Sequence, residues 1–328
     1  MPDFLRAALW VLALIVGGCA ALLMVTYVFP QTQAINPLLA MAGALVPYGM
    51  VLWLLTLILI AISAQRAWRL LGLIPIAALC VQLLWVQGYL PGTAPQGTAP
   101  GLRIASVNTL YGKADPASIA AGLAETRADI IVLQEASQPL AESAELAEVL
   151  DDYPYREGRL APGYSNIGYE DSSATYIASK RPLTLMESLD TTHEQYLLRT
   201  TTRADVPVTV LVAHTTNMLG GTKRWVDEAH LLADAVERHT DEPLLIIGDL
   251  NATPENLAYR IITDAGVSSA ASQAGHGWAP TYRPAPGLPA LIAIDHALIN
   301  ERLMAYRYAT FPVTGSDHRG IVVDIAVR

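Results

Sequence analysis

The residues best suited to chemistry lie in the segment 244–256, which reads LLIIGDLNATPEN. Four apolar residues, 244–247, predict a short strand that is buried on both faces. Asp249 and Asn251 follow it two positions apart, so their side chains can point the same way. Thr253-Pro254 then predicts the start of a helix. An Asx turn that only ends a strand would use the same residues, but a strand-to-helix corner is also where open sheets carry catalytic groups.

Polar residues end other apolar runs of the sequence in the same way. Each one alone has a structural explanation, such as a helix cap, a buried histidine with satisfied hydrogen bonds or a turn. Their repetition in a sequence poor in charge indicates a shared site. Besides Asp249 and Asn251, these residues are Asn108, Glu135, His214, Asp317 and His318, while Asp295 interrupts the run IAIDHALI.

Five of these segments, in this order, resemble the endonuclease/exonuclease/phosphatase superfamily. They are SVN (106–108), LQE (133–135), GDLN (248–251), IDH (294–296) and GSDH (315–318). That superfamily includes deoxyribonuclease I, exonuclease III, neutral sphingomyelinases and inositol polyphosphate 5-phosphatases. The resemblance covers residues 102–328 and implies an α+β fold, a four-layer sandwich of two mixed sheets flanked by helices. One departure is Thr109-Leu110, where nuclease members often place a further acid or polar group.

The resemblance also implies a metal site. Glu135 would be the principal metal ligand, with Asn108 beside it, and Asp317 would support the geometry of the metal or its surroundings. Carboxylate and amide oxygens without a thiol suit Mg²⁺, with Mn²⁺ as the other candidate. Such an ion neutralises phosphoryl charge and activates a bound water. We therefore expect a divalent-metal-dependent phosphatase or phosphodiesterase.

The remaining residues of the resemblance imply an acid–base apparatus. Asp249 would orient or deprotonate the attacking water, and Asn251 would hold a phosphoryl oxygen. His318, polarised by Asp295, would bind or protonate the phosphate or serve as the base. His214 would donate to a non-bridging oxygen. An Asp–His pair fixes the tautomer of the imidazole and raises its basicity.

Two loops, 158–172 and 267–290, are expected to form the rim of the site. Trp278 and Tyr282 in the second loop, together with Arg224 after His214, are candidate substrate-binding residues. Aromatic and basic groups there could stack a base or lie at a lipid interface, although ordinary loop packing is the alternative. His296 follows Asp295 on a strand and should face the other way. The other histidines, His193, His230, His239 and His276, are expected at the surface or in loops.

The N-terminal part of the chain is predicted to be a membrane domain. No charged residue occurs between Arg6 and Arg66, and three apolar stretches of spanning length lie at about 7–29, 38–63 and 70–90. The positive-inside rule, applied to Arg6, Arg66 and Arg69, puts the N-terminus in the cytoplasm and everything after residue 90 outside it. The sequence thus predicts a multi-pass protein of the cell membrane with an extracytoplasmic domain.

A Pro/Gly/Thr linker, 91–100, is expected to tether the domain 101–328 to the bilayer. Extended at ~3.1 Å per residue, it reaches at most about 30 Å. The 21 basic and 30 acidic residues of the chain include three and one before residue 101, which leaves 18 and 29 and a net charge of −11 for the domain. Such a surface repels polyanions and argues against nonspecific nucleic-acid binding.

The hydrophobic pattern predicts alternating helices and strands early in the domain and mostly strands later. Helices are expected after Asp115-Pro116 and at 138–150, 222–239 and 255–264. The loop 267–290 is expected to be irregular. Strands are expected at 102–107, 129–134, 173–179, 183–186, 197–204, 206–213, 292–299 and 320–327.

Three functions follow from these expectations. The favoured one is a membrane-anchored hydrolase of a phosphate-bearing lipid, because a short tether meets head groups before it meets free DNA. Three spans before such a domain also resemble membrane proteins of the VanJ type, which points to a polyprenyl diphosphate carrier. An anchored extracytoplasmic nuclease and a non-catalytic lipid- or partner-binding module are the alternatives. The oligomeric state does not follow from the sequence.

Overall fold

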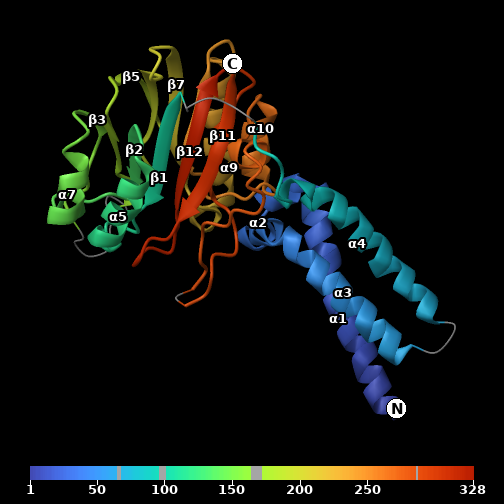
Figure 1. Ribbon diagram of the computed structural model, residues 1–328. Coiled ribbons are helices and arrows are strands. Elements are labelled where there is room, and N and C mark those ends of the chain that lie inside the picture. Colours follow the sequence, from blue (N-terminus) through green and yellow to red (C-terminus); the bar gives the residue numbers. More distant parts are fainter. Residues whose placement is uncertain (65–67, 96–100, 164–171, 286) are drawn as a thin grey trace. The chain divides into compact units, whose positions relative to one another are not determined.

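The computed structural model describes residues 1–64, 68–95, 101–163, 172–285 and 287–328. These residues form two compact units (Figure 1). The first contains Met1–Gly88 together with Glu255–Leu257, and the second contains Tyr89–Pro254 and Ala258–Arg328. Arg66, one of the three cations on which the predicted membrane orientation depends, lies outside the described residues. Positions 96–100 of the expected linker lie outside them too.

The first unit is helical throughout its described part. Three stretches are long and apolar enough to cross a membrane, namely Asp3–Val28, Val46–Ser63 and Trp68–Tyr89. The helices are α1 (Asp3–Val28), η1 (Pro30–Ala34), α2 (Pro37–Ala44), η2 (Val46–Tyr48), α3 (Gly49–Ser63), η3 (Trp68–Gly72), α4 (Leu73–Trp85) and η4 (Val86–Tyr89). The apolar stretch 38–63 is therefore not one continuous helix. It changes to a 3₁₀ turn at Pro47, whose missing N–H cannot continue the α-helical ladder.

Packing in the first unit uses small residues and buried amides. Gly17 of α1 faces Thr56 of α3, whose Cγ2 would lie only 3.2 Å from an added Cβ, so the two backbones approach closely. The fully buried Gln33 holds the segment Glu255–Leu257. Its Oε1 accepts from Asn256 Nδ2 (2.9 Å) and from the backbone N of Leu257 (3.1 Å). The helix expected from residue 255 accordingly begins at Leu257.

The second unit contains two six-stranded mixed sheets. The first sheet has the order β11-β12-β1-β2-β4-β3, with β1 and β2 parallel. The second has the order β5-β6-β7-β8-β10-β9, with β7 and β8 parallel. The strands are β1 (Leu102–Asn108), β2 (Ile130–Gln134), β3 (Tyr155–Gly158), β4 (Thr175–Ser179), β5 (Thr184–Leu189), β6 (Gln195–Thr201), β7 (Pro207–His214), β8 (Leu244–Asp249), β9 (Ser268–Ser269), β10 (Asp295–Ile299), β11 (Leu303–Phe311) and β12 (Gly320–Val327).

Strands β1 and β2 of the first sheet are buried on both faces, in two separate cores. Along β1, Leu102 and Ile104 belong to the core shared with the second sheet, whereas Ala105 and Val107 belong to a core shared with helices. This is the two-residue alternation of a strand that is covered on both sides, and it explains the nearly continuous apolar sequence. The helices that complete the layers are α5 (Pro116–Thr126), α6 (Gln138–Ala141), α7 (Ala144–Leu150), α9 (Thr222–Glu237), α10 (Leu257–Asp264) and α11 (Ala270–Gln273). The predicted four-layer sandwich is confirmed (Figure 1).

Several elements differ from the sequence expectation. The helix expected at 138–150 is divided into α6 and α7, because Ser143 ends the first turn by donating to Leu140 O (2.8 Å). The loop 267–290 contains β9 and α11, and the strands β3 and β11 were not expected. The strand expected at 292–299 begins only at Asp295, where it pairs with Asp249.

Candidate active site

The polar strand ends meet at one edge of the two sheets. Asn108 ends β1 beside Gln134 of the parallel strand β2, and Glu135 follows directly. In the second sheet, His214 ends β7 beside Asp249, which ends the parallel strand β8. The carboxyl ends of parallel neighbours lie at the same edge, so each sheet brings its own residues together. Both sheets therefore contribute to a single cluster.

Asn108 connects the contributions of the two sheets. Its Nδ2 donates to Glu135 Oε1 (3.2 Å) and to Asp249 Oδ2 (3.0 Å), and its Oδ1 accepts from the backbone N of Leu110 (3.0 Å). The side chain is buried, so water does not readily replace these hydrogen bonds. Asn108 consequently sets the spacing between the expected metal ligand and the expected general base.

Glu135 is held by a backbone in left-handed conformation. Its φ is +56°, and Leu110 (+51°) and Tyr111 (+56°) share that conformation ahead of Gly112 (+70°). This turn aims the backbone N of Tyr111 at Glu135 Oε2 (2.8 Å). Burial raises the pKa of Glu135, while the hydrogen bonds from Asn108 and Tyr111 oppose that rise. Left-handed non-glycine residues are strained and persist where the surroundings fix them, typically at functional sites.

Thr109, which stands where nucleases often have an acid, has a structural role. Its hydroxyl donates to the backbone oxygens of Gln134 (3.0 Å) and Glu135 (2.9 Å) and is buried. It thereby fixes the end of β2 from which Glu135 projects. Ser316 has a comparable role, because its Oγ donates to Asn108 O (2.9 Å) and accepts from His318 N (3.0 Å). Both hydroxyls were missed in the sequence, where they look like ordinary turn residues.

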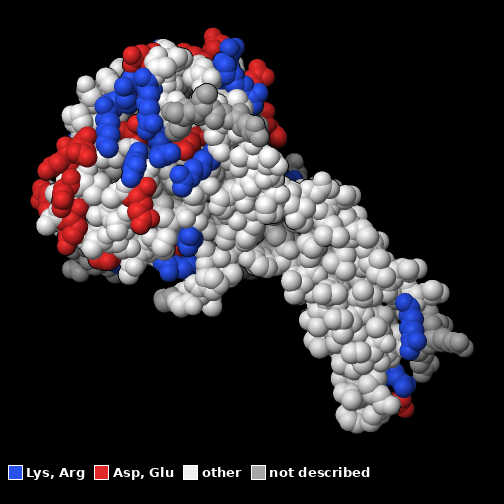
Figure 2. Space-filling view, viewed as in Figure 1, with Lys and Arg blue, Asp and Glu red and all other residues white. Residues whose placement is uncertain are grey.

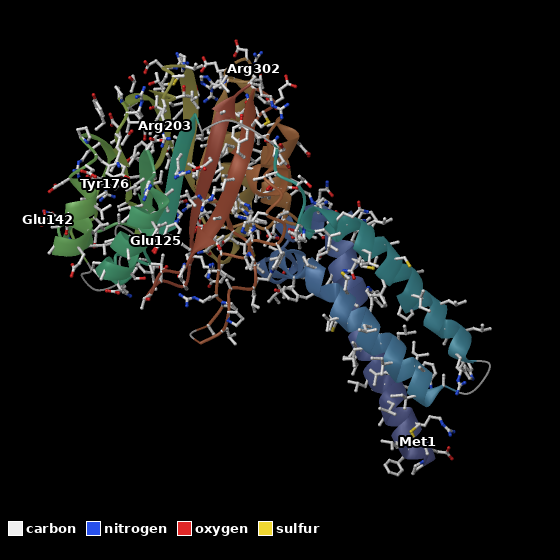
Figure 3. All side chains as sticks on the ribbon, in the orientation of Figure 1. Met1, Glu125, Glu142, Tyr176, Arg203 and Arg302 are labelled. Atoms are coloured by element: carbon white, nitrogen blue, oxygen red, sulfur yellow. The ribbon has the colours of Figure 1, made fainter. Side chains whose placement is uncertain are left out.

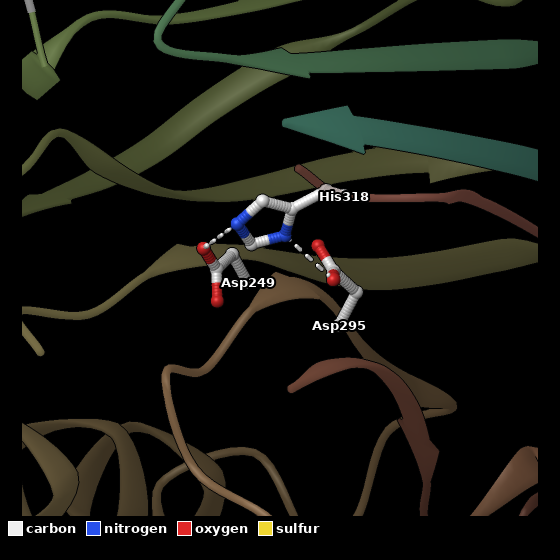
Figure 4. Close-up of side chains that lie close together, drawn as sticks. All are labelled: Asp249, Asp295 and His318. Atoms are coloured by element: carbon white, nitrogen blue, oxygen red, sulfur yellow. Dashed lines mark hydrogen bonds and ion pairs between the residues drawn. The ribbon is translucent and has the colours of Figure 1, made fainter. Parts of the chain in front are cut away.

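Asp295, His318 and Asp249 form a buried row (Figure 4). His318 Nδ1 lies 2.8 Å from Asp295 Oδ2, which fixes the tautomer and orientation of the ring. His318 Nε2 lies 3.8 Å from Asp249 Oδ2 and 3.8 Å from Asp317 Oδ1. The row therefore matches the expected Asp–His pair, with the free ring nitrogen facing two further carboxylates.

The electrostatics of the Asp295–His318–Asp249 row favour the protonated form of His318. Burial would lower the pKa of His318, but the carboxylates of Asp295 and Asp249 outweigh it and raise that pKa above its usual range. Burial raises the pKa of Asp249, although the charge of His318 opposes the rise. A buried carboxylate and an imidazole whose pKa values are both shifted in this way are suited to acid–base catalysis.

His214 lies against the other side of the cluster. Its Nε2 is 3.7 Å from Glu135 Oε1 and 4.0 Å from Asp249 Oδ2. Burial lowers the pKa of this ring well below its usual value, so His214 is neutral at pH 7 and can donate one hydrogen bond. Its Nδ1 has no hydrogen-bond partner among the described residues. His214 therefore lies within the cluster, and its donation to a phosphoryl oxygen stays a prediction.

His193 lies in the connection between β5 and β6, as expected of a loop residue, but it has a partner that the sequence did not indicate. It is buried, and its ring stacks on that of His214 with a centroid separation of 4.0 Å and an angle of 16°. Glu228 of α9 holds the segments that carry the two histidines. Its carboxylate accepts from Thr192 N (2.9 Å) and from Thr216 N (2.7 Å). The contact joins positions 21 residues apart in the sequence, which no local motif signals.

Removing the stack of His193 on His214 should weaken catalysis without unfolding the protein. We expect His193→Ala to lower kcat by roughly tenfold, since an aromatic pair contributes about 0.5–1.5 kcal/mol to placing a ring. His193→Phe keeps the stack and should retain most of the activity, and His230→Ala on the exposed face of α9 is the control. Equal kcat values for the Phe and Ala variants would show that stacking does not position His214.

Asn251 lies at the corner after β8, and its side chain bonds another residue of the protein. Its φ is +44°, and its backbone N donates to Asp249 Oδ1 (2.8 Å). Its Nδ2 donates to Thr215 O (2.8 Å), which leaves the second amide hydrogen for another acceptor. Trp225 of α9 donates to Asn251 O (3.2 Å) and is fully buried. The corner after β8 is therefore rigid.

The three expected substrate-binding residues lie in different surroundings. Tyr282 is next to the cluster, with its ring 5.2 Å from that of His318. Trp278 instead packs edge-on against Tyr89 (4.6 Å), and its backbone N donates to Tyr89 O (2.9 Å). Arg224 is exposed on the first turn of α9. Most of the other rim loop, 164–171, lies outside the described residues. Substrate contact for Arg224 and Trp278 stays a prediction.

The described start of the linker is anchored rather than free. The backbone N of Gly92 donates to Gly275 O (3.1 Å), beside the contact between Tyr89 and Trp278. A Cβ at Gly275 would lie 2.5 Å from Gly92 O, and one at Gly277 would lie 2.8 Å from Tyr89 O. Only glycine permits this close approach. The start of the linker is therefore held by the backbone of the loop around Gly275.

The donor set of the cluster fits a hard divalent cation. Asp249, Asp295 and His318 place one ligand atom each within 4.8 Å of one another, an arrangement that could hold a metal ion. Asp295 is already bonded to His318, whereas Asp317 Oδ1 is buried without a hydrogen-bond partner among the described residues. The two cysteines, Cys19 and Cys80, belong to the other unit, so the donors here are oxygen and imidazole nitrogen.

Residues 105–318 match the Endonuclease/Exonuclease/phosphatase family. The chain belongs to this family. All of the strand-end residues discussed above, from Asn108 to His318, lie within the matched region or at its end. The family's hydrolases act on phosphoester bonds, which agrees with the buried acid–base row and the oxygen-rich cluster. No curated protein matches the chain.

Solved structures support the fold independently. An endonuclease/exonuclease/phosphatase from Beutenbergia cavernae is 20% identical with a TM-score of 0.52, covering 69% of this chain and 71% of that one. Humanized D. rerio TDP2 is 16% identical with a TM-score of 0.54, covering 69% and 99%. An AP endonuclease from Archaeoglobus fulgidus is 15% identical with a TM-score of 0.52, covering 69% and 100%. At these identities the likeness shows the fold alone.

Proposed function

We propose that this member of the Endonuclease/Exonuclease/phosphatase family is a membrane-anchored phosphoester hydrolase that acts outside the cytoplasm on a lipid-linked phosphate. The substrate class is a polyprenyl diphosphate or a phospholipid head group. One observation carries the proposal: the same chain contains the buried row Asp295–His318–Asp249 and three stretches able to cross a membrane. A hydrolase fixed to a bilayer meets lipid phosphates at high effective concentration.

The residues of the cluster divide the chemistry between them. Asp249 takes a proton from the attacking water, and the Asp295–His318 pair supplies a proton to the phosphoryl group or its leaving oxygen. His214 and Asn251 donate to non-bridging oxygens, which stabilises the charge that develops there. Glu135, Asn108 and Asp317 would hold Mg²⁺, with Mn²⁺ as a substitute. The bound ion would supply Lewis-acid stabilisation of the phosphoryl charge.

The proposed location has its own test. Arg6 and Arg69, with Arg66, put the N-terminus in the cytoplasm and the hydrolase domain outside. Protease added to intact spheroplasts should therefore remove residues 101–328 and leave a membrane-embedded N-terminal fragment. A cytoplasmic protein of the same cells is the internal control. Protection of the domain until the membrane is lysed would reverse the orientation.

The substrate class is tested with full-length protein reconstituted into liposomes. Phosphate release should be at least about tenfold faster from a polyprenyl diphosphate or phospholipid in the same vesicles than from the same lipid in separate vesicles, because tethering raises the effective concentration. A soluble phosphomonoester should show no such difference. Rapid cleavage of plasmid DNA with no lipid turnover would favour the alternative, an anchored nuclease. Binding of lipid without turnover of either would favour a non-catalytic module.

A further inference from the structure

An open pocket of about 580 Å³ lies away from the catalytic edge. It is lined by Arg103, Ala124, Glu125, Arg127 and Arg307. Arg103 is near the start of β1, whereas Asn108 ends that strand at the catalytic cluster. Five residues of extended chain at ~3.3 Å each separate the two by about 17 Å. The pocket is thus distinct from the candidate active site.

The register of the first sheet aligns two of these arginines. Arg103 of β1 and Arg307 of β11 both lie opposite Asp324 of β12, the strand between them. Directly opposite residues of antiparallel strands project from the same face. A register shift between Ala305 and Arg307 sets the second pairing, because one residue of β11 has no counterpart in β12. The sheet therefore presents Arg103, Asp324 and Arg307 in a row.

Arg103 is a fixed cation in this row. Its Nε and Nη2 donate to the two oxygens of Asp324 (2.5 and 2.7 Å), and its Nη1 donates to Thr126 O (2.9 Å). The hydrogen bond with Asp324 raises the pKa of Arg103. Three of the five guanidinium N–H groups are thus used, and the other two are left for a ligand.

Arg127 and Arg307 bring uncompensated charge to the pocket. Both are exposed, and among the described residues neither guanidinium forms an ion pair or a side-chain hydrogen bond. Arg127 ends α5 in left-handed conformation, with a φ of +51° and a backbone hydrogen bond to Ala124 O (3.3 Å). The carboxylate of Asp324 is already occupied by Arg103. Glu125 is the remaining acid in the lining.

This concentration of arginine contrasts with the charge of the domain. The net charge of residues 101–328 is −11, from 18 basic and 29 acidic residues. Blue side chains nevertheless gather on the face that carries β1 and β12 (Figure 2), the face on which Glu125 and Arg203 are labelled in Figure 3. Neighbouring cations without counter-charges repel one another, and a bound anion would relieve that repulsion.

We propose that the pocket of Arg103, Arg127 and Arg307 binds a phosphate group. Guanidinium groups recognise phosphate by paired N–H donors, and the pocket is lined by Arg103, which Asp324 holds, and by the exposed Arg127 and Arg307. The phosphate belongs either to a soluble phosphorylated molecule or to a lipid head group. This site does not depend on the hydrolase activity proposed above.

The test uses full-length, EDTA-treated protein in phosphatidylcholine nanodiscs, titrated calorimetrically with inorganic phosphate. We expect saturable binding that weakens by roughly tenfold in Arg307→Ser and Arg127→Ser, in line with a lost charge-assisted hydrogen bond. The double variant should lose it. Glu125→Gln should strengthen binding by removing a repulsive charge. The exposed Arg302→Ser is the control and should bind as the wild type does.

A second arm identifies the source of the phosphate. If the natural ligand is a head group, phosphate binding to the wild type should be weaker in nanodiscs that contain phosphatidic acid than in discs of phosphatidylcholine alone. Unchanged affinity in both discs would assign the pocket to soluble phosphates. Phosphate binding that is absent, or that survives in the Arg127/Arg307 double variant, would overturn the proposal.

Discussion

Asp249→Asn and His318→Ala should each lower the turnover of the phosphoester substrate by about 10²–10⁴-fold, the usual effect of removing a positioned acid or base. Asp249 is fully buried next to His318, and the Asp295–His318 hydrogen bond of 2.8 Å fixes the ring that faces it. Neither group can be replaced by solvent at that depth. Single-turnover rates with saturating substrate measure the effect on the chemical step.

The two losses should not be additive. Asp249 and His318 are neighbours in the buried row, with Oδ2 and Nε2 3.8 Å apart, so removing either one disables the pair. The double variant should be close to the worse single variant. A matched control is Asp227→Asn, which changes an exposed acid of α9 that bonds Lys223 (2.6 Å). Multiplicative losses would mean that the two residues act in separate steps, and turnover within threefold of the wild type would remove them from the mechanism.

The second large effect concerns the metal. EDTA should abolish activity, and Mg²⁺ or Mn²⁺ should restore it, because the cluster offers hard oxygen donors. Glu135→Gln should lower activity at limiting metal by about 10–100-fold or more, as changes at metal sites commonly do. The shape of the side chain is kept, so the backbone bond from Tyr111 can persist. Activity titrated against Mg²⁺ gives the apparent affinity.

The matched control for this variant is Glu142→Gln. Glu142 lies between α6 and α7 and is exposed (Figure 3). Its carboxylate accepts a hydrogen bond from the nearby Gln138. Thermal unfolding should show that both variants are folded. An Mg²⁺ titration of Glu135→Gln that overlays the wild type would exclude Glu135 as a ligand, whatever happens to kcat.

The sequence predicted the sheets better than the loops. Strands such as β1, β2 and β8 are apolar on both faces, and this pattern follows from burial between two layers. The polar residues at their ends, including Asn108 and Asp249, were recognisable because each motif is only a few residues long and ends an apolar run. Register then brings them together, since parallel neighbours end at one edge.

The parts that could not be predicted depend on contacts between distant segments. His193 has no motif, and its role appears only because the connection before β6 folds over His214. Trp278 looks like a rim aromatic, but its partner is Tyr89, at the end of the last apolar helix. Strand β11 is partly exposed and carries a register shift, so it lacks a regular alternation. Local patterns contain no information about such pairings.

The division of the cluster between two sheets has a consequence for folding. Glu135 comes from the first sheet and Asp249 from the second, and Asn108 joins them by hydrogen bonds of 3.2 and 3.0 Å. Neither sheet alone contains both groups. Glu135 and Asp249 can therefore be close only when the two sheets are packed against each other. Activity thus reports on the packing of the sheets together and not on the formation of either one.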